Sequence, residues 1–236
     1  MQVSKEPGKI RSMFGAIAHR YDLLNHTLSL GTDIWWRWLT ARRLRPYLRQ
    51  DRPALDLCTG TGDLALGLSR YGAVVGCDFT HPMLVRAAAK TRRRRLQGRV
   101  RFAEGDALRL PFSDESFTAV SIAFGLRNLE SYSAGLKEML RVLRPGGALA
   151  VLECSQPRLP VFKHFFLFYF NHVLPRVGRL ISGDDFAYTY LPTSVADFPG
   201  PRQLKALLEE CGFRHVRHKL LMGGVACLHV AEKSGT

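Results

Sequence analysis

The sequence lacks any apolar run long enough to cross a membrane as a helix. The longest such run lies around Phe165–Phe170, far short of the roughly 20 residues that a spanning helix needs. The start of the chain, Met1–Ser12, carries charges and has no apolar core like that of a secretory signal peptide. We therefore expect a cytoplasmic protein whose contact with a membrane is at most peripheral.

Cysteine is scarce and scattered. None of the five forms a Cys-x-x-Cys pair, and most stand inside apolar segments: Cys58, Cys77, Cys154, Cys211 and Cys227. Cysteine in such positions behaves as a small buried hydrophobic residue. We expect no disulfide framework and no metal site, and a reducing compartment suits this pattern.

Acidic residues are few relative to basic ones, with 20 Asp and Glu against 34 Lys and Arg and a formal net charge of +14. Such a surface attracts anions, and the partner is nucleic acid, an acidic membrane or nothing in particular. The densest basic run, Lys90–Arg95, follows a predicted helix, where cations are favourable and often only solvated. Because no RNA-binding module is recognisable, we expect no nucleic-acid partner and favour peripheral contact with an anionic membrane.

The middle of the chain alternates short apolar strands with helices. The expected strands are Ala54–Cys58, Ala73–Cys77, Val100–Ala103, Thr118–Phe124 and Ala148–Leu152, and the helices between them are 63–70, Pro82–Arg95 and Ser133–Leu143. This alternation predicts parallel βαβ units. A last helix, Arg202–Cys211, precedes two strands, Phe213–Leu220 and Val225–Ala231, joined through a Gly-containing turn. The fold class is therefore α/β, a doubly wound and mostly parallel seven-stranded sheet with a C-terminal antiparallel hairpin.

The N-terminal region is helical by its pattern. Apolar residues recur at alternating spacings of four and three, at Ile10, Phe14, Ile17, Tyr21, Leu24 and Leu28, which indicates one face of a helix or a helical pair. The segment Trp35–Leu48 is predicted to be an amphipathic helix that ends near Pro46. We interpret 1–236 as a single domain with a helical cap at 1–50 and a core at 51–155.

A glycine-rich turn follows the first strand. Gly60-Thr61-Gly62 stands where this strand gives way to a helix, and glycine there permits close approach of the backbone to a ligand. The spacing Gly60-x-Gly62-x-x-Ala65 also satisfies the relaxed dinucleotide fingerprint. A nicotinamide oxidoreductase is therefore an alternative, which the terminal hairpin opposes.

Two acids at strand ends sharpen this prediction. Asp78 ends the second strand, 16 residues after the last glycine of the turn, where a carboxylate can accept both hydroxyls of a ribose. Asp106 follows the third strand, where a carboxylate can accept from an exocyclic adenine amine. Together with the turn, these acids predict a nucleoside site, and Asp106 counts against a nicotinamide cofactor.

Three motifs carry a resemblance to a known family. They are Phe14–Asn25 (FGAIAHRYDLLN), Leu55–Asp63 (LDLCTGTGD) and Ile122–Asn128 (IAFGLRN). Further matches follow at Arg141–Gly147, Ile181–Gly183, Ala187–Pro192 and Gly223–Val225. The chain resembles the quinone-biosynthetic C-methyltransferases, namely the demethylmenaquinone and polyprenyl-methoxybenzoquinol methyltransferases, over nearly its whole length.

The resemblance implies a class I methyltransferase of Rossmann-like fold that uses S-adenosyl-L-methionine. The cofactor-binding residues that we expect are Gly60, Thr61, Gly62, Asp78, Asp106 and Ala107, with Tyr21 closing over the methionine end. The implied substrate is a prenylated quinol, most simply demethylmenaquinol, although the benzoquinol stays open. The chain departs from the usual family residues at Gly15, Ala123 and Cys154.

Methylation at carbon requires an electron-rich ring, so the site must favour the phenolate. Arg127 and Asn128 follow the fourth strand, at the edge where the methyl group would point. Arg127 stays protonated and cannot be the base, but it can stabilise the oxyanion or orient a water; its alternative role is an ion pair with an acid. Tyr188 and Tyr190 are candidates to hydrogen-bond a quinol oxygen, unless they belong to the core.

The segment 156–200 is predicted to be an aromatic lid over the acceptor, followed by a terminal helix and hairpin at 201–236. Nine of the 21 Phe and Tyr residues lie within 162–190, an excess that favours a lid over a helix that merely covers the sheet. Three other functions stay open: methylation of another lipophilic molecule, RNA methylation, and a nucleoside-binding scaffold. The sequence also leaves a homodimer open. Against RNA methylation, Ala123-Phe124-Gly125 replaces the Asn/Asp-Pro-Pro-aromatic signature of amino-group methylases.

Overall fold

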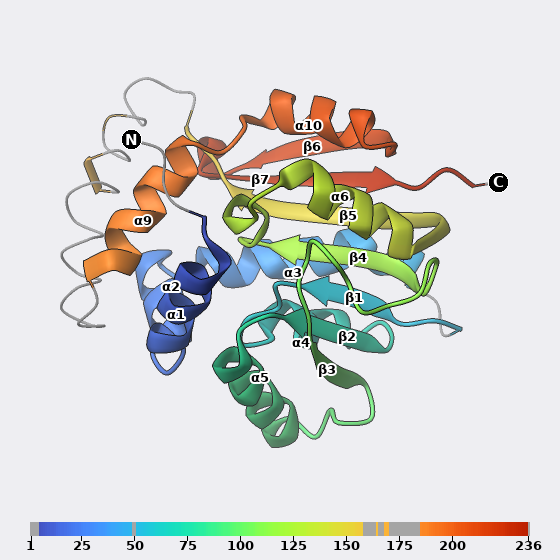
Figure 1. Ribbon diagram of the computed structural model, residues 1–236, viewed down its shortest axis with the longest axis horizontal. Coiled ribbons are helices and arrows are strands. Elements are labelled where there is room, and N and C mark those ends of the chain that lie inside the picture. Colours follow the sequence, from blue (N-terminus) through green and yellow to red (C-terminus); the bar gives the residue numbers. More distant parts are fainter. Residues whose placement is uncertain (1–4, 49–50, 158–163, 165–167, 170–184, 236) are drawn as a thin grey trace.

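The computed structural model describes residues 5–48, 51–157, 164, 168–169 and 185–235, with only the backbone described for 185–189. One seven-stranded sheet in the order β3-β2-β1-β4-β5-β7-β6 forms the centre of the molecule (Figure 1). Its strands are β1 (Ala54–Leu57), β2 (Val74–Asp78), β3 (Val100–Glu104), β4 (Phe117–Ala123), β5 (Leu143–Cys154), β6 (Arg214–Leu221) and β7 (Ala226–Glu232). The predicted fold class is confirmed.

Helices lie on both faces of the sheet and at its edge. They are α1 (Pro7–Ile17), α2 (Tyr21–Leu28), α3 (Thr32–Leu44), α4 (Asp63–Leu68), α5 (His81–Arg93), α6 (Tyr132–Val142), α9 (Asp185–Ala196) and α10 (Pro201–Glu210). Short 3-10 turns are η1 (Arg45–Tyr47), η2 (Leu126–Asn128) and η4 (Met222–Gly224). Across the described parts of the chain, no helix has the length and apolarity to cross a membrane.

One helix and one strand differ from the sequence-based expectation by more than two residues, while most other boundaries shift by one or two. The helix expected to start at Trp35 starts at Thr32 and ends at Leu44, and the 3-10 turn η1 follows it. Pro46 explains this end, because proline lacks the backbone donor that would continue an α-helix. The strand expected from Ala148 begins at Leu143, which pairs with Phe117 across an irregularity in the β4–β5 register.

The strand order of the sheet indicates at which edge a ligand would bind. β1 pairs in parallel with β2 on one side and with β4 on the other, while β7 runs antiparallel to both of its neighbours. Strand order therefore reverses between β1 and β4, and an open α/β sheet forms its ligand crevice at the carboxyl ends of the strands beside such a point. Helices α1, α2 and α9 lie at this edge in Figure 1.

Alternating residues of each strand pack into two separate cores. Leu55 and Leu57 of β1 face a core that contains apolar residues of α6 and α10, whereas Ala54 faces a core built with α3 and α4. This alternation is the period of two that a sheet buried on both faces requires. The sheet is thereby fixed from both sides, and the loops at its carboxyl edge start from a rigid base.

A third apolar cluster joins the N-terminal helices to α9. Ile10, Ile17 and Leu24 pack together with Tyr190 and Val195. The apolar stripe predicted for residues 10–30 is therefore confirmed as the inner face of a helical pair. The segment 156–200, predicted to be a lid, lies mostly outside the described residues.

Candidate active site

A cavity opens at the carboxyl ends of β1, β2 and β4. The space between its walls, open solvent included, is about 780 Å³. Its walls come from the strand-end loops on one side and from α1 and α2 on the other. Of the predicted cofactor residues, the structure brings five into this wall: Tyr21, Gly60, Asp78, Asp106 and Ala107.

Asp78 is held rigidly at the end of β2. One carboxylate oxygen, Oδ2, accepts the backbone N–H of Gly60 at 2.8 Å, and Oδ1 accepts that of Thr80 at 2.8 Å. Burial raises the pKa of Asp78, against the effect of these donors. Each oxygen keeps a further lone pair, so the carboxylate can accept hydroxyl groups from a ligand in the cavity.

Asp106 stands at the exposed lip of the same cavity, and Ala107 beside it is buried. The Asp106 Oδ1 atom accepts the backbone N–H of Leu108 at 2.9 Å, which closes a local turn. Apolar side chains of Phe79, Met83 and Leu108 also line the cavity. Carboxylates separated by apolar surface suit a nucleoside, which presents hydroxyls and an amine around an aromatic base.

Thr61 and Gly62 are not among the residues that line this cavity. The buried Thr61 hydroxyl donates to Asp22 of α2, and Lys90 Nζ of α5 lies 3.0 Å from the same oxygen. Lys90 also forms ion pairs with Asp22 at 2.6 Å and with Asp63 at 2.7 Å. Direct contact of Thr61 with the cofactor stays a prediction, while its observed contacts fasten α2 to the glycine turn.

A second cavity lies next to the first, among α1, α2, α3 and α9. It has about 1020 Å³ of empty space and is mostly apolar. Phe14, Tyr21 and Phe124 line both cavities, and the Phe14 and Tyr21 rings meet edge to face at 6.0 Å. A group passing between the cavities would therefore cross this aromatic boundary.

The loops that follow β1 and β4 are shaped by unusual backbone conformations. Cys58 has φ +51° and Phe124 has φ +59°, a region that non-glycine residues rarely occupy. A Cβ atom on Gly125 would lie only 2.5 Å from the Cβ of Cys58, so only glycine fits beside it. Strain of this kind is concentrated at functional sites, and here it places the Phe124 ring at the boundary between the cavities.

Arg127 lines the second cavity but is largely committed to protein contacts. Its Nη1 lies 2.9 Å from Glu153 Oε2 and donates to the Phe124 carbonyl at 2.6 Å. Burial opposes the charge, yet the Glu153 carboxylate outweighs it and raises the pKa of Arg127. The Nε atom is buried with no partner among the described residues. The ion pair with an acid, which the sequence analysis gave as the alternative role of Arg127, therefore exists. The Nε–H of the same side chain is a further hydrogen-bond donor.

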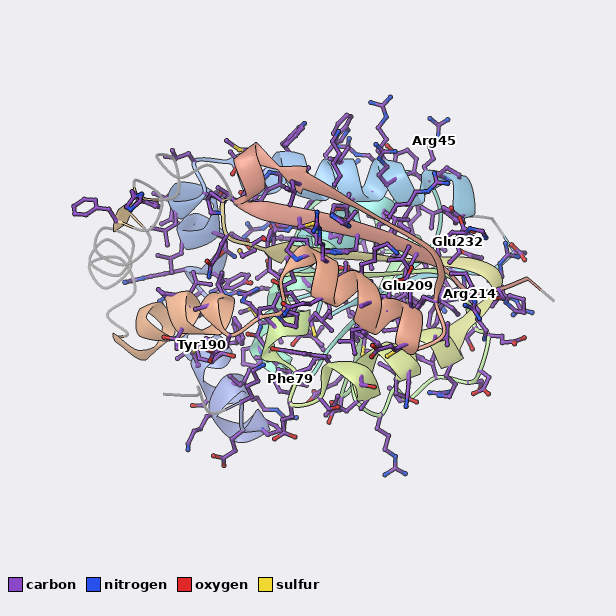
Figure 2. The ribbon with its side chains drawn as sticks, turned by 90° about the horizontal axis from the view of Figure 1, so that it is seen from above. Arg45, Phe79, Tyr190, Glu209, Arg214 and Glu232 are labelled. Carbon is purple, nitrogen blue, oxygen red and sulfur yellow. The ribbon has the colours of Figure 1, made fainter. Side chains whose placement is uncertain are left out.

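Asn128 and Tyr190 connect the two cavities. Asn128 lines the first cavity and Tyr190 the second, and the Tyr190 hydroxyl donates to Asn128 Oδ1 at 3.0 Å. The structure thus brings the predicted catalytic residues Arg127, Asn128 and Tyr190 together. In Figure 2, Tyr190 and Phe79 lie at the same end of the molecule, away from Arg214 and Glu232. The side chain of Tyr188 lies outside the described residues.

Burial controls the protonation of the two tyrosines. It raises the pKa of Tyr190 and of Tyr21 above the ordinary value of 10.0. Both hydroxyls are therefore protonated at neutral pH and can donate hydrogen bonds to an acceptor. Cys154, one of the departures from the family pattern, also lines this cavity, and burial raises its pKa to about 11. It is a neutral thiol there.

A second ion pair in the wall of the second cavity was not predicted. Arg37 of α3 pairs with Asp33, which is buried and accepts the Ser29 hydroxyl at 2.7 Å and His26 Nδ1 at 2.9 Å. Burial works against the charge, but Arg37, Ser29 and His26 together lower the pKa of Asp33. A hint existed in the i, i+4 spacing of the pair, but the spacing alone does not separate a cavity wall from an exposed helix face.

The comparisons with known proteins agree with this geometry. The model of the ubiE/COQ5 methyltransferase family matches residues 1–233. A demethylmenaquinone methyltransferase of Thermus thermophilus is 50% identical, covering 94% of this chain and 100% of its own. A protein of the same name from Deinococcus radiodurans is 47% identical, covering 95% of this chain and 92% of its own.

Solved structures show the same fold at low identity. The cyclase SpnF has a TM-score of 0.73 and 19% identity over 100% of this chain and 98% of its own. A putative methyltransferase from Bacillus halodurans has a TM-score of 0.57 and 22% identity over 79% of this chain and 94% of its own. These likenesses support the fold alone.

The nucleoside cavity and the family match point to the same chemistry. The enzyme is a methyltransferase whose cofactor is S-adenosylmethionine, and the strand-end acids and apolar wall of the first cavity fit that molecule. The chain belongs to the ubiE/COQ5 methyltransferase family.

Proposed function

We propose that the enzyme transfers a methyl group from S-adenosylmethionine to a ring carbon of a prenylated quinol, with demethylmenaquinol as the substrate. The observation that carries this proposal is the pair of adjoining cavities with a common boundary of Phe14, Tyr21 and Phe124. One cavity suits a nucleoside and the other an apolar ring. The names of the Thermus and Deinococcus relatives favour the naphthoquinol over the benzoquinol.

In the cofactor cavity, each predicted residue has a role that its position supports. Asp78 accepts the two ribose hydroxyls, because its oxygens are aligned by backbone donors and keep free lone pairs. Asp106 accepts the adenine amine at the lip, beside Ala107. Gly60 lets the backbone approach, since its φ of +54° lies in a region that residues with a side chain rarely adopt. Tyr21 closes the methionine end.

The acceptor cavity suits a neutral and lipophilic molecule. Its two arginines, Arg37 and Arg127, are already paired with Asp33 and Glu153. A paired cation offers little net charge to a polyanion such as RNA, whereas the apolar walls favour a quinol ring and its tail. These pairs therefore count against nucleic acid as the substrate.

Bound S-adenosylmethionine would supply the electrophilic methyl group of its sulfonium and would leave as the neutral thioether, while the phenol proton and the proton of the methylated ring carbon pass to solvent water. The protein holds the ring so that its carbon faces that group through the aromatic boundary, which removes much of the entropic barrier. Arg127, with the buried Nε donor, stabilises the oxygen that becomes anionic when the phenol loses its proton. Tyr190, whose hydroxyl proton is directed to Asn128 Oδ1, accepts a hydrogen bond from a quinol hydroxyl.

The substrate also suggests where the enzyme works. A prenylated quinol resides in a bilayer, and a chain with a net charge of +14 is attracted to anionic lipid heads. We therefore place the enzyme in the cytoplasm, in peripheral contact with the membrane, with the segment 156–200 as the lid over the acceptor.

The test is a methylation assay on reduced quinols under anaerobic conditions. We expect transfer to demethylmenaquinol, with product NMR showing a new carbon–methyl bond and no methyl ether. A demethylated benzoquinol serves as the matched acceptor and should react more slowly. Methylation of neither quinol, or methylation at oxygen, would contradict the proposal.

A further inference from the structure

Exposed apolar side chains gather on one part of the surface. Among the described residues, eight large hydrophobic side chains are exposed, and five of them lie within residues 23–38. We call these five the α2–α3 surface: Leu23, Leu30, Ile34, Trp35 and Trp38. Leu30 is 87% exposed, in the turn between the two helices. An apolar patch of this kind on a protein surface marks an interaction site.

The surface is continuous on each helix. Ile34, Trp35 and Trp38 fall on one side of α3, because residues three and four apart are neighbours on a helix. Leu23 lies on α2, and Leu30 lies in the turn that leads from α2 to α3. The two helices pack against each other, so these side chains form one outer face.

Charge along these two helices is mostly positive, although Asp63, in its ion pair with Lys90, lines the same groove as Ile34 and Trp38. Between residues 23 and 48 the single acid is Asp33, which is buried in its ion pair. Arg42 and Arg43 are exposed toward the end of α3, and the Arg42 guanidinium lies 5.3 Å from the centre of the Trp38 ring. Tryptophan beside arginine is typical of helices that lie in the headgroup region of a membrane.

The opposite sides of the same helices line the acceptor cavity. Leu24, Asn25 and Leu28 of α2, together with Trp36 and Arg37 of α3, form its wall. The two helices therefore separate the acceptor cavity from the α2–α3 surface. A molecule dissolved in lipid beneath this surface would have to cross only one layer of helix to reach the ring-binding space.

From this arrangement we propose that the α2–α3 surface is the membrane-docking face, and that its partner is an anionic lipid bilayer. The side chains of Leu30, Ile34, Trp35 and Trp38 enter the boundary between headgroups and acyl chains, while Arg42 and Arg43 contact lipid phosphates. The proposal rests on the proposed function, since a quinol in the bilayer gives the docking its purpose.

The protein carries its own probe of this contact. All three tryptophans, Trp35, Trp36 and Trp38, lie in α3, and two of them belong to the docking face. We expect vesicles of phosphatidylcholine with about one third phosphatidylglycerol to shift the emission to the blue, and brominated lipids to quench it. Vesicles of phosphatidylcholine alone should do so much more weakly. Sedimentation with anionic vesicles and an unchanged emission would overturn the proposal, because another surface would then be bound.

Substitutions separate this face from other exposed apolar residues. Leu30→Ser with Ile34→Ser keeps every tryptophan and should weaken vesicle binding at least about tenfold, since two apolar side chains no longer leave water. Val85→Ser with Met222→Ser is the matched control, because both residues are exposed elsewhere, and it should bind like the parent. Equal binding by both variants would overturn the proposal.

A second pair of variants tests the charges. Arg42→Gln with Arg43→Gln should lose about fivefold in affinity for each arginine. Arg92→Gln with Arg93→Gln removes two exposed arginines from the denser basic run at the end of α5 and should lose much less. The reverse order would place the membrane on α5 and overturn the proposal.

Turnover distinguishes failure of docking from failure of the proposed function. On a short-tailed, water-soluble quinol, the Leu30→Ser, Ile34→Ser variant should match the parent, and on vesicle-borne quinol it should be slower. An equal loss of turnover by this variant on both quinols would contradict docking. So would a dimer that the parent forms without lipid and that the two substitutions dissociate. A parent that methylates no quinol would count against the function and leave the vesicle result standing.

Discussion

The two cavities differ in the structural elements and polar groups that form their walls. The cofactor cavity is made mainly by the loops that follow β1 to β4, with α1 and α2 on one side, and its main polar group, Asp78, is aligned by backbone N–H groups. The acceptor cavity is made by helices, and its polar groups are side chains in the ion pairs Arg37–Asp33 and Arg127–Glu153. Backbone geometry follows from the sheet, whereas paired side chains depend on one another. We therefore expect the cofactor cavity to tolerate single changes better than the acceptor cavity.

The largest effect should come from the Arg127–Glu153 pair. Removing Arg127 alone leaves the Glu153 carboxylate buried and unpaired, which costs about 3–5 kcal/mol of stability. The double change Arg127→Met with Glu153→Gln removes both charges and tests catalysis in a folded protein. We expect turnover to fall about 10²-fold, the lower end for loss of an oxyanion donor, because Glu153 already balances the arginine. Cofactor affinity, measured by calorimetry, should stay near that of the parent.

The pH–rate profile of the double variant tests more directly whether Arg127 favours the phenolate. If Arg127 favours the phenolate, the gap between variant and parent should narrow as pH rises, because solvent then ionises more of the quinol. Glu153→Gln alone, assayed below its melting temperature, is the control that keeps the arginine. Full turnover by the double variant at neutral pH would remove Arg127 from the mechanism and leave Tyr190 and Asn128 as the groups that face the quinol.

The difference between a site aligned by backbone groups and one built from paired side chains also explains which residues could be predicted from the sequence. Asp78 and Asp106 could be placed from strand ends, because parallel strands bring their carboxyl ends to one edge whatever the side chains do. The contacts of Thr61 with Asp22 and Lys90 could not, since they join elements far apart in the chain whose approach depends on tertiary packing.

In the acceptor cavity, the sequence predicted the candidate residues but not the residues that they contact. The motif around Arg127 and Asn128 was identified, and an ion pair of Arg127 with an acid was foreseen without naming Glu153. The i, i+4 spacing of Asp33 and Arg37 did not place the pair in a cavity wall, because a single acid in an amphipathic helix is usually solvated. The positive φ of Phe124 also has no signature in its own side chain; only Gly125 beside it indicates a tight turn.

The intermediate effect should come from Asp78. Asp78→Asn keeps one oxygen acceptor but removes the charge, so S-adenosylmethionine affinity should fall by about 1.5–3 kcal/mol, roughly tenfold or more. Calorimetry measures this, and the melting temperature reports folding. Asp106→Asn is the matched change at the exposed lip and should cost less. An unchanged affinity in a folded Asp78→Asn protein would mean that the ribose lies elsewhere.

The smallest effect should come from Lys90, which joins the two regions. Its Nζ lies within 3.0 Å of Asp22 on the helical cap and of Asp63 and Thr61 beside the glycine turn. Lys90→Met leaves the two carboxylates facing each other without a cation, so α2 is held less firmly over the cofactor. Because these groups are partly exposed and screened by water, we expect about 1 kcal/mol, or a fivefold weaker cofactor affinity.

The effect of Lys90 should depend on salt in a way that a packing defect would not. Screening weakens exposed charge pairs as ionic strength rises, so the difference between Lys90→Met and the parent should shrink in high salt. Lys205→Met is the matched control, because Lys205 pairs with Glu209 on α10, away from both cavities, and it should leave cofactor affinity unchanged. A Lys90→Met protein with faster cofactor release and unaltered melting would show that the cap closes over the cofactor through this cation. Unchanged release would mean that the cap does not depend on this cation, and that the two cavities are not coupled through Lys90.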